Sequence, residues 1–314
     1  MLKRKALNKI LITTTTVFIL LTIYLIPISK EEEDRLEPSV TVEYKNSNHG
    51  YIYLLNDEKQ LVRTNIFVKD NENLKDKIKV MVEALIISNN DLIPKGLSAI
   101  VPKNTKVLAV GIEEDVVSLN FSKDILNVKA EDVEKMIEAI CNTIFDVDYI
   151  KGVIIYVNEV HINELVGIDI PDIITRDYGI NKRYDLKKLD DVSKVVIFYI
   201  DEIYDNKYYV PVTKYLNDDR DKIKIIVDEL SSSYVYEPNL ISYLNNSVIL
   251  TNYEIIEDRM TLNFNNSIFM KDGNVLEEVI YTISYSAFAN YDINEVIFEV
   301  GANNFVKKVT KNIE

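Results

Sequence analysis

Apolar residues recur along the chain at two periods, which predict where helices and strands lie. Two stripes have the spacing i, i+3, i+4, i+7 and i+11 of one helix face; they consist of Val133, Met136, Ile137, Ile140 and Ile144, and of Leu276, Val279, Ile280, Ile283 and Ala287. A further helix is predicted over 74–88, where Ile78, Val82 and Leu85 share a face. Runs rich in β-branched and aromatic residues predict strands over 51–55, 61–68, 106–111, 116–121 and 152–157.

The chain contains two copies of this pattern. Residues 77–82 (KIKVMV) match 222–227 (KIKIIV) with an offset of 222 − 77 = 145, and 118–121 (SLNF) match 261–264 (TLNF) with an offset of 261 − 118 = 143. Two single-residue deletions account for the difference. Because the register holds over about 110 residues, we interpret the chain as two homologous repeats.

The predicted order within each repeat is ββαββαβ, an α+β fold with two helices on one face of a mixed sheet. We place domain 1 at 49–165, a linker at 166–193 and domain 2 at 194–314. About 115 residues suffice for a core, so each repeat is expected to fold alone. The linker is expected to be exposed and to allow limited motion, with Ile168, Ile170, Ile173 and Ile174 docking on one domain.

The N-terminal 30 residues predict a transmembrane signal anchor. Four basic residues precede an uncharged run over 11–28, and four acidic residues follow at 31–34. As a helix this run would span about 27 Å, close to the thickness of the hydrocarbon core. The charge asymmetry places the N-terminus in the cytoplasm, a juxtamembrane tether at 31–48, and the bulk of the chain outside the cell membrane. A cleaved signal peptide is the alternative, although no small-residue cleavage site follows, and no lipoprotein cysteine is present.

Composition excludes several functions. The chain has 314 residues with 36 basic and 50 acidic side chains, a net charge of −14, which disfavours nucleic acid as a partner. One cysteine and two histidines exclude an internal disulfide and a zinc site of the usual Cys/His type. We therefore expect no cofactor, no metal and no small-molecule substrate.

The acidic clusters are interpreted as structural, so no catalytic residue is predicted. Glu113, Glu114 and Asp115 and, in repeat 2, Glu257 and Asp258 lie in hairpin turns. The acidic segments 70–73 and 218–221 precede helices, where carboxylates cap amides; a Ca²⁺ loop is the less favoured alternative, because its ligand pattern and central glycine are missing. His49 and His161 lie in no catalytic or metal-binding pattern, and Cys141 is expected to be a partly buried thiol.

Tyrosines are concentrated in repeat 2, and tyrosine is favoured at protein interfaces. The candidate interface residues are Tyr208, Tyr209, Tyr234, Tyr236, Tyr243 and Tyr253. The alternative is that these are ordinary strand and core tyrosines in a chain without tryptophan.

Several motifs resemble the GerMN-domain family. They are 92–96 (LIPKG), 116–122 (VVSLNFS), 139–144 (AICNTI) and 153–158 (VIIYVN), and they include the structural residues Pro94, Gly96, Asn120, Asn142 and Thr143, with Pro238 and Asn263 in repeat 2. Repeat 2 departs from the pattern with no glycine after Glu237-Pro238-Asn239 and with Tyr285-Ser286 in place of Asn142-Thr143. The family's protein is typically a lipoprotein, so the anchor predicted here would differ.

This resemblance implies a non-enzymatic role in endospore formation or germination outside the cytoplasm. GerMN domains are similar to the ring-building motifs of the channel complex that joins mother cell and forespore. The implied partners are other envelope or sporulation proteins, with a homo-oligomer left open, and the implied role is that of a membrane-anchored assembly or localisation factor. The alternatives are a protein that binds or remodels peptidoglycan and a solute-binding module.

Overall fold

The computed structural model describes residues 14–15, 49–68, 73–88, 93–147, 149–232, 239–301 and 304–311. The chain divides into two compact units, Met1–Tyr44 and Lys45–Glu314, and both repeats lie in the second. The predicted anchor at 11–28 lies outside the described residues except for Thr14 and Thr15. Across the described ranges, no helix has the length and apolar character needed to cross a membrane.

Repeat 1 has the predicted order ββαββαβ. Its elements are β1 (His49–Leu55), β2 (Leu61–Phe67), α2 (Leu74–Glu83), β3 (Val107–Glu113), β4 (Val116–Phe121), the 3₁₀ turns η1 (Lys123–Asn127) and η2 (Ala130–Asp132), α3 (Val133–Phe145) and β5 (Gly152–Val157). The side chain of Asn73 caps α2 by accepting a hydrogen bond from the Asp76 N–H at 3.0 Å. The α3 stripe is buried along its whole length.

Repeat 2 follows the same order and adds two strands. Its elements are β11 (Ser193–Ile203), β12 (Asn206–Leu216), α4 (Lys222–Ser231), β13 (Leu240–Ile241), β14 (Leu250–Ile256), β15 (Arg259–Phe264), η4 (Asn266–Ile268), α5 (Glu277–Asn290), β16 (Glu295–Val300) and β17 (Asn304–Thr310). Strand β17 pairs with β16 and completes a four-stranded sheet.

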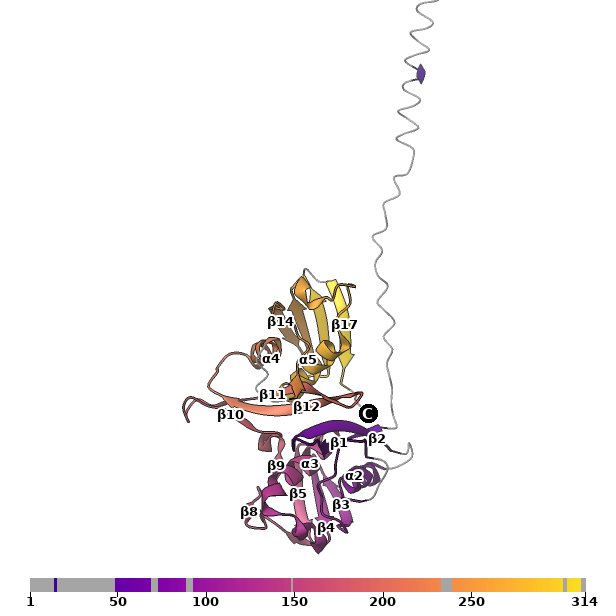
Figure 1. Ribbon diagram of the computed structural model, residues 1–314, viewed down its shortest axis with the longest axis vertical. Helices are drawn as coiled ribbons and strands as arrows, with labels where there is room; N and C mark the ends of the chain where they lie inside the picture. Colours follow the sequence, from indigo (N-terminus) through magenta and orange to yellow (C-terminus); the bar gives the residue numbers. More distant parts are fainter. Residues whose placement is uncertain are drawn as a thin grey trace, which may run out of the picture. The chain divides into compact units, whose positions relative to one another are not determined.

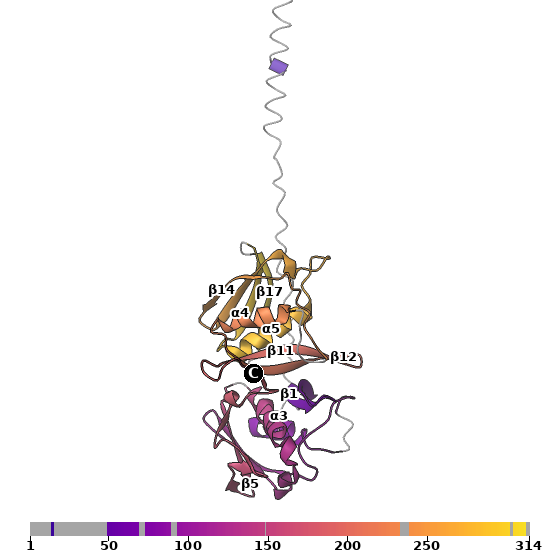
Figure 2. The ribbon, with the colours of Figure 1, turned by 60° about the vertical axis from the view of Figure 1, so that its left-hand side comes forward.

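The predicted α+β class with helices on a mixed sheet in each repeat is confirmed, but the prediction that the first hairpin belongs to that sheet is wrong. In each repeat the first hairpin forms no hydrogen bonds with the strands that follow the helices. The two helices lie between this hairpin and a second sheet made of the later strands (Figure 1). The hairpins of both repeats instead form one sheet with the order β1-β2-β12-β11-β13, in which Tyr209 pairs with Arg63. The layers therefore alternate as sheet, helices, shared sheet, helices and sheet, as the turned view also shows (Figure 2).

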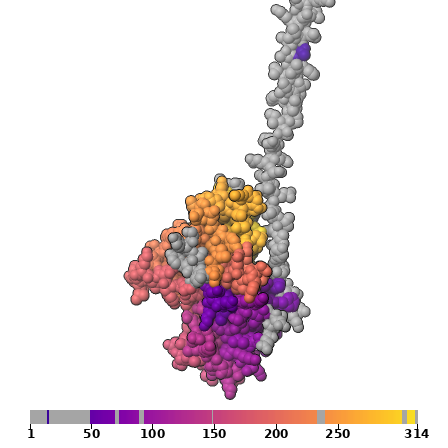
Figure 3. Space-filling model, in the orientation of Figure 1, coloured from indigo at the N-terminus to yellow at the C-terminus, as the bar shows by residue number. Residues whose placement is uncertain are grey.

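This shared sheet joins the repeats into one unit, and the expectation that each repeat folds alone stays a prediction. Buried apolar residues of both repeats belong to one cluster. In the space-filling view the indigo hairpin of repeat 1 lies directly against the orange surface of repeat 2 (Figure 3).

The linker is bound along much of its length. The end of repeat 1 forms the short strands β6 (Val160–His161) and β7 (Glu164–Leu165). The linker then forms β8 (Ile168–Asp169), β9 (Ile174–Thr175), the turn η3 (Arg176–Tyr178) and β10 (Arg183–Asp185). Strand β9 pairs with β5 of repeat 1, and β10 pairs with β12 of repeat 2. Ile170 and Ile174 are buried, whereas Ile168 and Ile173 are exposed.

Candidate interaction site at the repeat junction

Arg63 on β2 is at the centre of the junction. Its guanidinium forms two hydrogen bonds of 3.1 Å to the Asp146 carboxylate at the end of α3. It also lies 3.6 Å from the ring centre of Tyr51 in repeat 1 and 4.9 Å from that of Tyr285 in repeat 2. Arg63 is therefore held within repeat 1 by a bidentate ion pair and one cation–π contact, and it contacts repeat 2 through the ring of Tyr285.

Tyrosines of repeat 2 continue this cluster. Tyr285 packs at ring-centre distances of 5.0 Å from Tyr209 and 5.7 Å from Tyr281. Burial raises the pKa of Tyr209 and of Tyr285 above the usual phenol value. Burial alone would lower the pKa of Arg63, but the Asp146 carboxylate and the phenols of Tyr53 and Tyr285 raise it. The cluster thus holds one fixed cation among neutral phenols at physiological pH.

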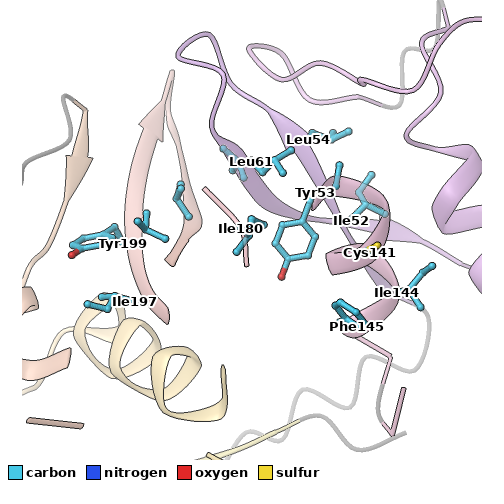
Figure 4. Packing of buried hydrophobic residues seen from close by; sticks show 14 of the residues in the cluster. Ile52, Tyr53, Leu54, Leu61, Cys141, Ile144, Phe145, Ile180, Ile197 and Tyr199 are labelled. Atoms are coloured by element: carbon cyan, nitrogen blue, oxygen red, sulfur yellow. The ribbon is translucent and has the colours of Figure 1, made fainter. Parts of the chain in front are cut away.

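Asn181 of the linker closes the sheet between the two hairpins. Its side chain accepts from the Leu61 N–H at 2.9 Å, and it donates to the Leu61 carbonyl at 2.9 Å and to the Pro211 carbonyl at 2.8 Å. Its own N–H donates to the buried Glu138 carboxylate at 3.0 Å. Figure 4 shows the preceding Ile180 between Tyr53 and Leu61 of repeat 1 and Ile197 and Tyr199 of repeat 2. The linker therefore binds both repeats at one point.

A local symmetry relates the two halves of the junction. Asn56 and Asp201 are equivalent positions, since 201 − 56 = 145, and they contact each other through a hydrogen bond of 2.8 Å. Both are buried. A residue that contacts its own counterpart lies at a twofold axis, so the repeats pack as a pseudo-dimer.

Loops of each repeat contact the hairpin turn of the other. Gly96, with φ +86°, leaves no room for a Cβ because Ile203 and Tyr204 of the β11–β12 turn lie against it. The neighbouring Lys95 ammonium lies 4.5 Å from the Tyr204 ring centre. Reciprocally, Asn239 of repeat 2 donates to Glu58 in the β1–β2 turn at 2.6 Å. These exchanged contacts restrain relative motion of the repeats.

Comparisons with known proteins agree with this architecture. A family model described as Germane, sporulation and spore germination, matches residues 51–162. The spore germination protein GerM of Bacillus subtilis (strain 168) is 26% identical over 286 residues, which cover 88% of this chain and 77% of that protein. The solved structure of the tandem GerMN domains of the B. subtilis sporulation protein GerM matches with a TM-score of 0.73 and 27% identity, covering 81% of this chain and 91% of the other.

Residues 51–162 therefore match the GerMN-type family, and the chain as a whole is similar to GerM over most of its length. Both repeats take part in the likeness, because the matched structure contains tandem domains and covers most of the chain. The GerMN motif residues can therefore be assigned structural roles from the contacts that each one makes here.

The GerMN motif residues hold strands and loops in place. The Thr143 hydroxyl accepts from the Tyr53 N–H at 3.2 Å, and Ser286 in repeat 2 accepts equivalently from Phe198 at 2.8 Å. Asn120 and Asn263 bind the turns that follow β5 and β16, through Glu159 and Gly301. Asn142 donates to the Glu138 carbonyl within α3. Pro94 precedes the turn at Gly96, and Pro238 lies outside the described residues.

The candidate interface tyrosines occupy several places. Tyr209 lies in the junction cluster, and Tyr208 beside it is half-buried. Tyr243 contacts Glu202 and lies 4.6 Å from the Lys207 ammonium, and Tyr253 lies 5.8 Å from that of Lys224. Tyr234 and Tyr236 lie outside the described residues. Tyr209 pairs with Arg63 of repeat 1, and an interface role for the other three described tyrosines stays a prediction.

Other expected features are placed as follows. The acidic residues 113–115 and 257–258 lie in hairpin turns, and Asp115 and Asp258 use their carbonyls to bind residues 151–152 and 294–295. Cys141 is fully buried instead of partly buried, because α3 lies between two sheets, and burial raises its pKa.

Within the described residues no group of His, Cys, Asp and Glu could hold a metal ion. Arg63, Asp146 and Asn181 were missed by the sequence reasoning.

Proposed function

We propose that this protein is a non-enzymatic, membrane-anchored assembly or localisation factor that acts outside the cytoplasm in sporulation or germination. The observation that carries the proposal is the similarity to GerM over 88% of the chain. The rigid junction is consistent with a scaffold, because a shared sheet, loop contacts between the repeats and a bound linker fix two domains as one body.

The proposed site of action follows from the N-terminal sequence. A cationic start and an uncharged run at 11–28 support a single membrane pass with the bulk of the chain outside. The proposed partners are other proteins of the envelope, including the channel complex between mother cell and forespore. Binding through ring-building-like domains would require no chemistry from the carboxylates or histidines.

Localisation in sporulating cells tests this function. A fluorescent fusion is expected to collect at the membrane between mother cell and forespore and to disperse in strains that lack channel components. Uniform distribution in both strains would overturn the proposal. The uncleaved anchor has its own test, which is N-terminal sequencing of the protein extracted from membranes. A mature N-terminus beyond Ser29 would overturn it.

Peptidoglycan binding is a second candidate, supported by one observation. Tyr184 is 64% exposed, and its ring is stacked on Tyr215 at 4.9 Å with an interplanar angle of 10°. A fixed aromatic ring with one open face can stack against a sugar ring. Sedimentation of the full chain with purified cell wall tests it: loss of binding in Tyr184→Ala would favour this candidate, and absence of wall binding in the unchanged protein would exclude it.

A further inference from the structure

The outer sheets of the two repeats present very different faces at equivalent positions. In β3–β4–β5 the outward residues are Ala109, Gly111, Glu113, Val116, Ser118, Asn120, Gly152, Ile154 and Tyr156. In β14–β15–β16 they are Asn252, Glu254, Ile256, Arg259, Thr261, Asn263, Glu295, Ile297 and Glu299. The alternate residues of the central strands β4 and β15 are fully buried against the helices, which fixes these sets as outward-facing.

Charge separates the two faces. Repeat 2 has four charged residues among its nine, and Glu295 accepts from Arg259 at 2.7 Å and from Lys308 at 2.9 Å. At the positions equivalent to Arg259 and Glu295, repeat 1 has Val116 and Gly152, since 259 − 116 = 143. The charged member of the repeat 1 set is Glu113, at the turn. The repeat 1 face is therefore almost uncharged in a chain whose net charge is −14.

Small and apolar side chains make up the β3–β4 part of the repeat 1 face, whereas residues that follow β5 cover its β5 edge: Gly152 is buried beneath Ile173, and the His161 ring centre lies 5.5 Å from that of Tyr156. Gly111, Ala109 and Gly152 lack long side chains, and Ser118 lies directly against Gly111. Ile173 lies over Gly152 and Val116 and is itself 50% exposed. Val116, Ile154 and Tyr156 remain partly accessible to solvent. Small residues permit a second sheet to approach closely, at about the 10 Å typical of packed sheets.

We propose that this β3–β4–β5 face is an interface between two copies of the chain, packed face to face. Two chains of charge −14 repel each other wherever their acidic surfaces meet, and this face removes that penalty because it brings almost no charge into contact. A nearly uncharged face is complementary to itself, whereas recruitment of a basic partner would use a charged patch. The equivalent face of repeat 2 would oppose like charges in such a dimer. This inference does not depend on the proposed role in sporulation.

The size of the face sets the expected strength. Three strands about 4.8 Å apart and six residues long at about 3.3 Å per residue cover roughly 300 Å² per copy. The total of about 600 Å² is well below the area typical of stable protein interfaces, so the dimer is expected to be weak and to depend on concentration. Confinement of anchored copies to one membrane would raise their effective concentration.

Cysteine cross-linking of the full chain in membranes tests the interface, because the one native cysteine, Cys141, is buried and its pKa is raised. Ser118→Cys places a thiol at the centre of the proposed interface, and Thr261→Cys places one at the equivalent point of repeat 2. With a short bismaleimide, which adds one thiol to each of its two double bonds, we expect a covalent dimer from Ser118→Cys at least tenfold more abundant than from Thr261→Cys.

A second substitution tests the chemistry of the face. Val116→Arg installs the residue that repeat 2 has at the equivalent position, so it should lower cross-linking by Ser118→Cys at least tenfold; Ile154→Lys serves the same purpose if the first variant does not fold. A thermal unfolding midpoint equal to that of the unchanged protein confirms that each variant retains the fold. Equal cross-linking at the two cysteine positions, or cross-linking unaffected by either charge substitution, would overturn the proposal. Capture of another protein at Ser118→Cys in place of a dimer would likewise overturn it in favour of a heterotypic contact.

Discussion

The two repeats share a fold but stabilise the junction with different residues. In repeat 2, Asn290 binds the N–H and C=O of Val196 on β11, at 3.1 and 2.6 Å. The equivalent residue in repeat 1 is Val147, since 290 − 143 = 147, and it cannot form these bonds. Repeat 1 instead carries the Arg63–Asp146 ion pair, whose equivalents in repeat 2 are Tyr208 and Ala289.

This difference explains a departure of repeat 2 from the family pattern. Tyr285 stands where repeat 1 has Asn142, and its ring contacts Arg63 across the junction. Repeat 1 thus contributes the charge, and repeat 2 contributes the aromatic surface around it. Duplicated domains that pack together need complementary contact residues, and the divergence of equivalent positions supplies them.

Separation of the repeats is the most severe test of this comparison. The fragment Asn48–Leu165 lacks β12, Asn181 and Tyr285, so β2 loses its neighbouring strand and Arg63 loses one aromatic contact. We expect this fragment to unfold cooperatively in urea, but at a lower urea concentration than the whole chain. A fragment extended to residue 185 restores Asn181 and should recover part of the lost stability. Cooperative unfolding of the shorter fragment with nearly unchanged stability would contradict a shared fold.

Removal of the junction cation should have the next largest effect. Arg63→Ala leaves Asp146 partly buried without its partner, and breaking a buried ion pair costs about 3–5 kcal/mol. Arg63→Lys keeps the charge but loses the bidentate geometry, so a smaller loss is expected. Equilibrium unfolding in urea measures the change. The matched control is Arg220→Ala, whose exposed ion pairs with Asp218 and Asp228 should contribute less than about 1 kcal/mol; equal losses would refute the assignment.

The sequence predicted the repeats and their element order because both depend on local periodicity. The α3 stripe and the alternation along β4 each place apolar residues on one face, and both faces are buried. Which sheet a hairpin joins depends instead on a long-range strand pairing, and no periodicity in 61–67 or 206–216 specifies the partner. The single-sheet prediction failed for this reason.

The sequence pattern indicates some of the junction residues better than others. Arg63 interrupts a run of strand-forming residues, and a charge at such a position indicates a partner, although not which one. Asn181 gave no signal, because its role depends on a backbone with φ +47° and on two carbonyls from distant strands. The high number of tyrosines in repeat 2 correctly drew attention to Tyr209. It does not distinguish tyrosines at the junction between the repeats from tyrosines on the outer surface.

The exchanged loops offer a graded test of the comparison. Gly96→Ala combines a left-handed backbone with a clash against Ile203 and should cost about 2 kcal/mol. Gly273→Ala has the same backbone conformation, φ +82°, with open space around it, so its cost of about 1 kcal/mol isolates the backbone contribution. Asn239 has φ +76° and takes the left-handed position near the equivalent point of repeat 2. Thermal unfolding of the two glycine variants measures both losses of stability. Equal losses would contradict a packed loop at Gly96.

The smallest effect concerns the charged outer face of repeat 2. Hydrogen bonds from Lys308 and Arg259 lower the pKa of Glu295 in the folded chain. A lowered pKa stabilises the fold above the unfolded-state pKa of about 4.3, and that contribution is lost as the pH falls through the folded-state pKa. Glu295→Gln should therefore reduce the free energy of unfolding by less than about 1 kcal/mol at pH 6, and the difference from the unchanged protein should disappear once the pH lies below the folded-state pKa. In an Arg259→Met, Lys308→Met background the carboxylate has lost both cations, so the same substitution should have no effect at pH 6. A loss at pH 6 that persists in this background would show that Glu295 stabilises repeat 2 by packing instead of charge, and the contrast between the two outer faces would then concern shape more than electrostatics.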